Sequence, residues 1–406
     1  MSGSQGALAG RRVLEIGGAA GAYCGKLLAD MGADVVKVER PRGDPSRAIP
    51  PFFEDRPGPD RSLFFLYMNT SKRGVTLDFE QPSGRSLLRR LALRADIVVE
   101  SLPPGTLDTQ GLGFASLAAE RPRIVVTSIT GFGQTGPHAD WSSSDLVAGA
   151  MGGALYVTGE ADDPPVALAG QQNHLMACTT AAVSSLIALR HAQRSGRGQH
   201  VDISIQETTL AVSHISGVGK WLDDGIVPRR VGSALTASVP SGAYPCRDGR
   251  VYLMVNRPAH WRALAAWINE ETGNQEVLDP MFEGPSSRRI EYRELLDIFI
   301  SDMTQLHSVD EIFHEGQRRH IAFTPLCTTE EVARDAHLAA RDYFVSVPHG
   351  ECGPLRMPGA PYRHQATPWA IRHPAPQLGE HNDELYRGEL GMTSAELDNL
   401  RHQGVV

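Results

Sequence analysis

Four consecutive polar residues, Gln171 to His174, stand directly before a long apolar run that ends at Gly196. The run predicts a helix, and Asn173 is a suitable N-cap for it. His174 would then lie in the first turn. Because a helix N-terminus disfavours a cation, its imidazole is expected to be neutral at pH 7. A neutral imidazole can accept a proton, so His174 is either a candidate general base or an ordinary first-turn residue.

Two glycine-rich segments could bring backbone N–H groups close to a ligand. EIGGAAG follows a buried strand, but Ile16 stands where a dinucleotide fingerprint needs its first glycine. TGFGQTGP (130–137) follows another strand and lacks the Lys-Ser/Thr ending of a P-loop. Ligands of open α/β sheets bind beyond the carboxyl ends of the strands. The segments are therefore either ligand loops at that edge or plain tight turns.

The sequence carries no HExxH, GxSxG or paired Cys-His signature. Its five cysteines are far apart, and none belongs to a CxxC pair: Cys24, Cys178, Cys246, Cys327 and Cys352. This usage fits a reduced compartment and argues against a disulfide framework or a zinc site. We therefore predict no metal.

Strand-like and helix-like segments alternate over the first half of the chain. RRVLEIGG, AGAYCGKLLADMG and ADVVKVER predict a strand, a helix and a second strand, which is a βαβ unit with parallel strands. The alternation continues through the helix SGRSLLRRLALRA, the strands DIVVES and RIVVTSI, and the helix that Gly196 ends; HVDISIQET is then predicted as a strand. This order predicts a doubly wound, Rossmann-like α/β domain.

The pattern changes after about residue 215. GAYPCRDGRVYLMVN predicts a hairpin that turns at Asp248-Gly249, and HWRALAAWIN and YRELLDIFISDMTQL predict helices. These segments indicate a smaller α+β region. Near the C-terminus, TSAEL contains a capping box formed by Thr393 and Glu396.

Charge and targeting signals exclude several classes of partner. The net charge of −8 gives no electrostatic reason to expect nucleic acid or an anionic membrane. The start, MSGSQGALAGRR, lacks the apolar core of a signal peptide, and no run approaches the roughly 20 apolar residues of a membrane span. We expect a cytoplasmic protein that binds small molecules.

Taken in series, several segments resemble the family III CoA-transferases. They are AGAYCGKLLADMGADVVKVERPRGDPSR, NTSKRGVTLDF, SSSDLVAGAMGG, RSGRGQHVDIS, PGAPYR and APQLGEHNDELYRGELGM. The resemblance covers nearly the whole chain. It implies a large α/β domain built from residues 1–205 and 325–406, and a small α+β domain over 231–310. It further implies linkers at 206–230 and 311–324 and a homodimer of interlocked rings.

The resemblance implies an acyl-CoA and a carboxylic acid as substrates, with CoA bound to the large domain. Thr109 stands where the family often has an arginine. The positions implied to contact CoA are Ala19, Ala20, Arg40, Leu77, Asp78, Ser101, Leu102 and Thr109.

The family's nucleophilic aspartate corresponds to His174, when counted back from SGRGQ and forward from AGAMGG without gaps. In the family that aspartate attacks the acyl-CoA, forms an anhydride and then carries CoA as a thioester. Asn173 directly precedes the position. Ser144 stands where the family has a tyrosine, or a histidine in its racemases, and Asp145, which follows it, is kept from the family's pattern. The resemblance thus implies CoA transfer with His174 in place of the aspartate.

Three alternatives stay open. His174 could remove an α-proton in a CoA-thioester isomerase, dehydratase or lyase, with glycine-loop N–H groups holding the enolate. The chain could be a non-catalytic subunit that pairs with an active homologue. The scaffold could also serve a ligand that is not a CoA ester.

Overall fold

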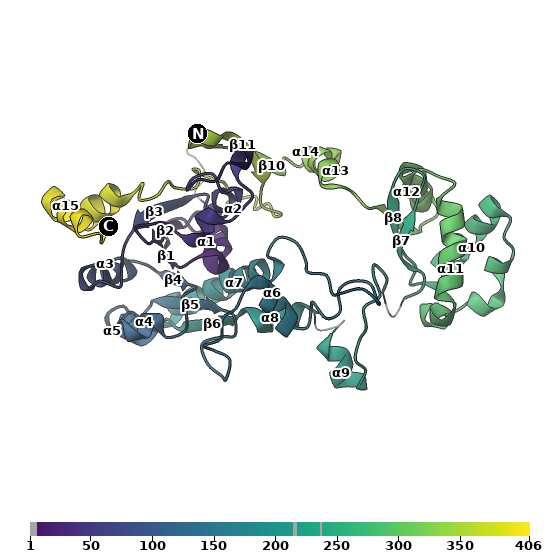
Figure 1. Cartoon of the computed structure of the whole chain (residues 1–406), viewed down its shortest axis with the longest axis horizontal. Helices are drawn as coiled ribbons and strands as arrows, with labels where there is room; N and C mark the ends of the chain where they lie inside the picture. The colour runs from purple at the N-terminus through teal and green to yellow at the C-terminus, as the bar shows by residue number, and fades with distance from the viewer. Residues whose placement is uncertain (1–5, 214–216, 236–237) are drawn as a thin grey trace. The chain divides into compact units, whose positions relative to one another are not determined.

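The computed structural model describes residues 6–213, 217–235 and 238–406, and the chain divides into two compact units. The larger unit comprises Met1–Ala154, Ala167–Leu222 and Arg341–Val406. The smaller unit comprises Leu155–Val166 and Asp223–Ala340. The larger unit is therefore assembled from both ends of the chain (Figure 1).

A six-stranded sheet in the order β3-β2-β1-β4-β5-β6 organises the larger unit. All neighbouring strands are parallel. The strands are β1 (Arg12–Ile16), β2 (Asp34–Glu39), β3 (Lys72–Thr76), β4 (Ile97–Glu100), β5 (Val125–Thr130) and β6 (His200–Ser204). The order changes direction between β1 and β4, which makes this the switch point of a doubly wound sheet. The predicted doubly wound α/β fold is confirmed.

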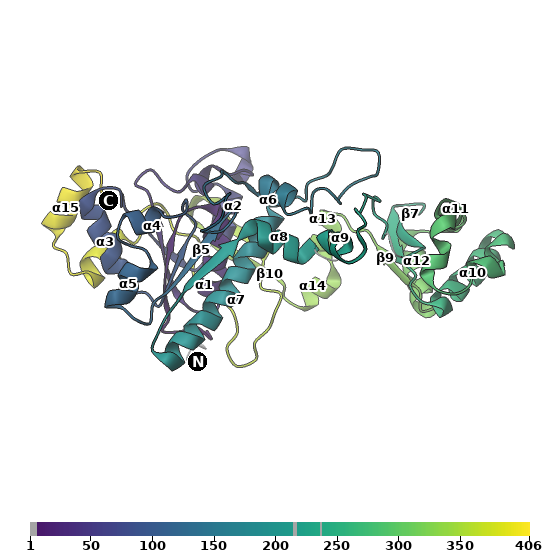
Figure 2. The same ribbon diagram turned by 90° about the horizontal axis from the view of Figure 1, so that it is seen from below.

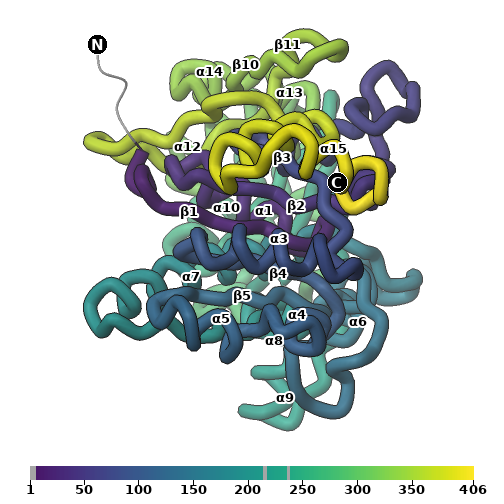
Figure 3. Tube along the Cα trace, turned by 90° about the vertical axis from the view of Figure 1, so that its left-hand side faces the viewer, coloured from purple at the N-terminus to yellow at the C-terminus, as the bar shows by residue number. Residues whose placement is uncertain are grey.

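Helices cover both faces of this sheet (Figures 1 and 3). One face carries α1 (Ala19–Asp30) and α7 (Gln172–Ser195). The other carries α3 (Pro82–Ala92), α4 (Thr106–Thr109), α5 (Phe114–Glu120) and α15 (Ser394–His402). Strands that are buried on both faces need apolar side chains on both, which explains why they read as continuous apolar runs.

Helix α7 packs along α1 and β5 and ends at Gly196, as predicted (Figure 2). Its buried face is rich in alanine, which lets the helices approach closely. The Ser185 hydroxyl lies 2.7 Å from that of Thr127 on β5. By length and composition α7 is apolar enough to cross a membrane, so the prediction that no segment approaches a span is wrong. Its alanines pack in this core, whereas Val183 and Ile187 are exposed.

Strand β6 is shorter than HVDISIQET predicts, because α8 (Ile205–Ser213) begins directly after Ser204. The Ser204 hydroxyl accepts a hydrogen bond from the Glu207 N–H, as a cap does. The predicted linker 206–230 thus contains α8 and α9 (Val218–Asp224); its residues 214–216 lie outside the described ranges.

The remaining elements of the larger unit are short. They are η1 (Pro45–Ala48), η2 (Phe53–Asp55), α2 (Leu63–Met68), α6 (Asp145–Met151), β10 (Phe344–His349), η7 (Gly350–Cys352), β11 (Gly353–Pro358) and η8 (Asp383–Glu389). The C-terminal segment covers the edge strand β3: the Thr76 N–H donates to Asn382 Oδ1 at 2.9 Å, and the Tyr386 hydroxyl donates to the Thr76 carbonyl at 2.9 Å. This arrangement hides an edge that would otherwise expose free backbone groups.

The smaller unit is an antiparallel sheet covered by helices. The predicted hairpin joins β7 (Ser241–Pro245) to β8 (Arg250–Met254), and β9 (Ala322–Pro325) pairs with β8. Its helical segments are α10 (Pro258–Thr272), η4 (Glu276–Leu278), η5 (Pro280–Phe282), η6 (Ser286–Tyr292), α11 (Arg293–Thr304), α12 (Val309–Arg318), α13 (Thr329–Arg334) and α14 (Ala336–Ala340). The prediction of a linker over 311–324 is wrong, because Ile312 and Phe323 are buried in the core of this unit.

Candidate active site

Helix α7 begins at Gln172, and Gln171 is its N-cap in a left-handed conformation (φ 57°) without a side-chain cap. The prediction that Asn173 caps this helix is therefore wrong. Asn173 lies inside the first turn and is buried. Its Nδ2 donates to the Asp145 carbonyl at 3.0 Å and to Asp145 Oδ2 at 2.9 Å, and its Oδ1 accepts from the Thr209 hydroxyl at 3.0 Å. The amide joins α6, α7 and α8.

Asp145 supplies the cap that α7 lacks. Its Oδ1 accepts a hydrogen bond from the His174 N–H at 2.9 Å, while the first turn of α7 contains no acidic residue of its own. A carboxylate at a helix N-terminus stabilises it by about 0.3–1 kcal/mol. Ser144 is the N-cap of α6, and its Oγ accepts from the Val147 N–H at 3.3 Å. Asp145 therefore positions the start of α7, and Ser144 positions the start of α6, which carries Asp145.

The imidazole of His174 is neutral at pH 7. Burial lowers the pKa of His174 below its ordinary value, and the nearby charge of Asp145 opposes the shift without reversing it. Nδ1 lies 3.4 Å from Gln171 Oε1. Since that oxygen only accepts, the contact favours the tautomer with its proton on Nδ1, which leaves the Nε2 lone pair free.

His174 lines a cavity of about 350 Å³ at the carboxyl ends of the strands. The walls come from the first turn of α1, the loop after β4, the loop after β5 and the start of α8. The lining residues are Ala20, Ser101, Leu102, Pro103, Pro104, Ile129, Thr130, Gly131, Ala139, Asp140, Trp141, Ser142, Ser143, His174 and Ile205. Because α1 follows β1 and the loop at Ser101 follows β4, the cavity lies at the switch point of the sheet, where this fold binds ligands.

Glycine allows the loops after β1 and β4 to meet. Gly17 has φ +110°, and a Cβ there would lie 2.5 Å from the Ser101 hydroxyl oxygen. At Gly21 the corresponding distance is 3.2 Å. The glycines of EIGGAAG thus serve a tight turn and place Ser101 beside the first turn of α1. Within the described residues, Ser101 Oγ and Thr130 Oγ1 are buried polar atoms without a protein hydrogen-bond partner.

Three predicted CoA contacts, Ala20, Ser101 and Leu102, share the cavity with His174. Other predicted contacts lie outside its lining. The Arg40 guanidinium pairs with Asp78 at 2.9 Å and stacks on the Phe79 ring at 4.1 Å.

Leu77 is fully buried, and the Thr109 hydroxyl donates to the Thr106 carbonyl. Ala19 opens α1 next to Ala20 without lining the cavity. A role for Ala19, Arg40, Leu77, Asp78 and Thr109 in CoA binding stays a prediction.

Two cavity residues of the loop after β5, Asp140 and Trp141, were not predicted. Trp141 lines the cavity with 54% of its surface exposed. Asp140 is the one carboxylate in that lining. The only sequence feature that could have indicated them is their position after TGFGQTGP, a loop at the carboxyl end of a strand. Neither residue belongs to a local sequence pattern.

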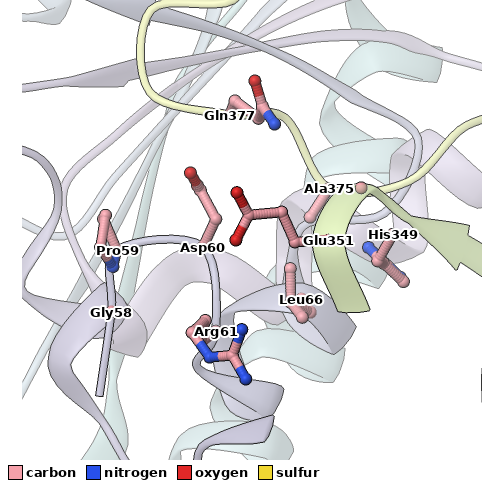
Figure 4. Close-up of a pocket in the computed structure, with 10 residues that line it drawn as sticks. Gly58, Pro59, Asp60, Arg61, Leu66, His349, Glu351, Ala375 and Gln377 are labelled. Atoms are coloured by element: carbon pink, nitrogen blue, oxygen red, sulfur yellow. The ribbon is translucent and has the colours of Figure 1, made fainter. Parts of the chain in front are cut away.

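A second cavity of about 310 Å³ contains none of the predicted site residues (Figure 4). Its lining includes Asp60, Arg61, His349 and Glu351. Burial and the charge of Lys26 lower the pKa of His349 to about 4. Among the residues the structure describes, no group of three or more His, Cys, Asp or Glu side chains could hold a metal ion.

Residues 8–382 match the family described as CoA-transferase family III. The chain belongs to this family. It is 35% identical to the succinyl-CoA:(R)-benzylsuccinate CoA-transferase subunit BbsE of Thauera aromatica, over 97% of both chains. It is 34% identical to the succinyl-CoA–D-citramalate CoA-transferase of Chloroflexus aurantiacus, again over 97% of both.

A solved structure of a related protein has the same fold. A CaiB/BaiF family protein from Brucella suis superposes with a TM-score of 0.82, at 28% identity, over 95% of this chain and 99% of that one. The chain is thus a CoA-transferase-family enzyme that handles acyl-CoA, and the resemblance seen in the sequence is confirmed.

Proposed function

We propose that this protein transfers CoA from a CoA thioester to a carboxylic acid, with His174 accepting the acyl group. The observation that carries the proposal is the position of His174: a neutral imidazole lines the cavity at the switch point of the sheet. Neutral imidazole is a nucleophile, and histidine is known to form covalent intermediates.

The proposed reaction has three steps. First, His174 Nε2 attacks the thioester carbonyl carbon, and CoA leaves as the thiolate. Second, the acceptor carboxylate attacks the acyl-imidazole, which forms an anhydride of the two acids and frees His174. Third, the CoA thiolate attacks the acceptor's carbonyl carbon in that anhydride, giving the new thioester and the donor acid. One oxygen of the acceptor thereby moves directly into the donor acid.

The cavity offers groups that suit a thioester. Ser101 and Thr130 line it, and their hydroxyls have no hydrogen-bond partner among the residues that the structure describes. A hydroxyl can donate to the oxygen of a tetrahedral intermediate, where developing charge strengthens the hydrogen bond. We assign both hydroxyls this role in binding the acyl-CoA substrate. Because both oxygen atoms are buried, each side chain must rotate toward the cavity to donate there.

We propose succinyl-CoA as donor and a dicarboxylic acid as acceptor. The names of several relatives support this class, among them succinyl-CoA–D-citramalate, succinate–glutarate and succinyl-CoA:mesaconate CoA-transferases. These names also favour CoA transfer over isomerisation, elimination and a ligand that is not a CoA ester.

The test uses the purified full-length chain, succinyl-CoA and a panel of dicarboxylic acids, with new thioesters followed by mass spectrometry. His174→Ala should lower kcat by about 10⁶-fold, the size of the loss when a catalytic nucleophile is removed. His191→Ala is the matched control, because His191 is an exposed histidine of α7 outside the cavity lining; its kcat should stay within about threefold of the wild type.

Isotope transfer tests the intermediate itself. With ¹⁸O-labelled acceptor, a single turnover should place label in the released donor acid. Label retained on an enzyme carboxylate after that turnover would identify an aspartate or glutamate as the acyl acceptor and exclude His174 from that role.

A second candidate is a non-catalytic subunit that works beside another chain of the family. Two observations favour it: the Thauera relative is named a subunit of its CoA-transferase, and the first turn of α7 contains no acidic residue. In this case the isolated chain shows no transfer. Activity then requires co-expression with a second family III chain that carries the aspartate, and His174→Ala leaves the activity of the pair unchanged.

We further propose a homodimer located in the cytoplasm. The exposed apolar side chains Val183 and Ile187 on α7 and Val212 on α8 support an oligomer, because a second copy would cover them.

A further inference from the structure

Three aromatic side chains form a packed cluster in the loop after β5. The rings of His138 and Trp141 lie 3.8 Å apart between centroids, tilted by 33°. Phe132 meets both rings edge-on, at 6.1 Å from His138 and 6.2 Å from Trp141. The Trp141 N–H donates to the His138 carbonyl at 3.0 Å, which closes a turn between them. Phe132 is 8% exposed, so the cluster is anchored in the protein.

The cluster holds the Trp141 ring in place and leaves much of it exposed to solvent. Trp141 is 54% exposed although its ring is held by two neighbours. It lines the same cavity as His174, with Ile129 and Ile205 as apolar neighbours in the lining. A rigid, exposed indole inside a ligand cavity is suited to stack against a planar ring, because little conformational freedom is lost on binding.

We infer that Trp141 selects an acyl group that carries an aromatic ring. This inference rests on the proposed CoA transfer and specifies its substrate. The adenine of CoA also has a planar ring, but a long pantetheine arm separates it from the thioester. Since His174 and Trp141 line one cavity, a ring beside Trp141 belongs to the acyl end of the molecule.

The experiment compares acceptors that differ only in the ring: succinate, phenylsuccinate and cyclohexylsuccinate, each with succinyl-CoA. Trp141→Ala should lower kcat/KM for phenylsuccinate about tenfold, mainly by raising KM. It should change kcat/KM for succinate by less than about twofold. The loss for cyclohexylsuccinate should be smaller, because a saturated ring does not stack. Trp141→Phe keeps an aromatic face and should retain most of the phenylsuccinate activity.

Trp221 supplies a matched control, since it is also 54% exposed but lies on α9 outside the cavity lining. Trp221→Ala should leave kcat/KM unchanged for all three acceptors. Equal losses for succinate and phenylsuccinate in Trp141→Ala would overturn the inference, and so would no loss at all. Weaker binding of free CoA to Trp141→Ala, measured by calorimetry, would assign the ring to adenine and also overturn it.

Failure of the proposed function has a different signature. If the wild type transfers CoA to none of the acids, calorimetry with phenylsuccinyl-CoA and succinyl-CoA tests the inference without turnover. Trp141→Ala should then lose about tenfold in affinity for the phenylsuccinyl ester alone. Equal affinities of the wild type and Trp141→Ala for that ester would overturn the inference.

Discussion

At the scale of single residues, the environment of His174 decides which chemistry it can do. Burial keeps the imidazole neutral, and the Gln171 contact leaves one ring nitrogen unprotonated. A neutral histidine loses its nucleophilic lone pair when it is protonated. The pH dependence of the reaction therefore reports directly on this side chain.

We predict that kcat/KM for CoA transfer is constant from about pH 7 to 8 and falls with acid. The midpoint of the fall should lie below 6.5, because burial lowers the pKa of His174. Asp145→Asn removes the charge that raises this pKa, so the midpoint should move to still lower pH. The measurement is a pH–rate profile, or an NMR titration of the His174 ring if the isolated chain is inactive. An unmoved or raised midpoint in Asp145→Asn would contradict the assignment.

At the scale of elements, the start of α7 is held by neighbours rather than by its own sequence. Asn173 joins α6 and α8 through Asp145 and Thr209, and Asp145 holds the His174 N–H. The network fixes where His174 enters the cavity. Its polar groups are costly to leave unpaired, since Asn173 and Thr209 are buried.

Asn173→Ala should lower the free energy of unfolding by about 1–3 kcal/mol, the cost of unsatisfied buried partners. It should also lower kcat, because the first turn of α7 loses its anchor. Urea denaturation measures the first effect. Gln172→Ala is the control on the neighbouring exposed residue and should stay within about 0.5 kcal/mol of the wild type. Equal stabilities of Asn173→Ala and the control would contradict this account.

A second element-scale feature joins the first three strands beneath α1. Glu15 on β1 pairs with Lys37 on β2 at 3.2 Å and with Lys72 on β3 at 2.7 Å, and all three are buried. Burial and the charge of Lys37 lower the pKa of Lys72 to about 8, even though Glu15 opposes the shift. Glu15 is the carboxylate that the two lysines share, and Asp44 also pairs with Lys37 at 2.9 Å.

Glu15→Gln should destabilise the fold by about 3–5 kcal/mol, because it leaves two buried ammonium groups with less counter-charge. It should also lower the pKa of Lys72 further. Urea denaturation at pH 7 measures the loss. Asp34→Asn, which weakens the more exposed pairs with Arg12 and Arg73, is the control and should cost about 1 kcal/mol or less. A loss at Glu15 no larger than the control would show that the cluster is not needed for stability.

At the scale of the whole molecule, the exposed apolar residues of α7 predict self-association. Ile187 is 64% exposed on that helix, and Ile187→Asp should shift the protein from dimer to monomer in analytical ultracentrifugation. Leu278→Asp is the control, since Leu278 is a 48% exposed apolar residue of the smaller unit. A wild type that sediments as a monomer would contradict the predicted homodimer. In that case a different protein chain would have to cover these exposed apolar residues.

Local patterns predicted most elements of the fold. The apolar runs give the parallel strands, Gly196 ends α7, and the capping box at Thr393 starts α15. The errors fall where a distant partner decides the outcome. The linker prediction over 311–324 failed because β9 pairs with β8, some 70 residues earlier in the chain. The N-cap prediction failed because the amide of Asn173 is engaged by Asp145.

The sequence by itself determined the family of this protein and the histidine at position 174. Those properties follow from residue identity and order along the chain. Only the tertiary structure decided what surrounds that histidine. A carboxylate 29 residues away caps its helix, and one cavity holds an exposed indole and two hydroxyl-bearing residues whose hydroxyls have no partner within the described ranges. Ser101 comes from the loop after β4, whereas Thr130, Trp141 and Asp145 come from β5 and the segment that follows it. The two segments meet because the parallel strands end at one edge of the sheet. Contacts of that kind are set by the sheet order, which no local pattern encodes.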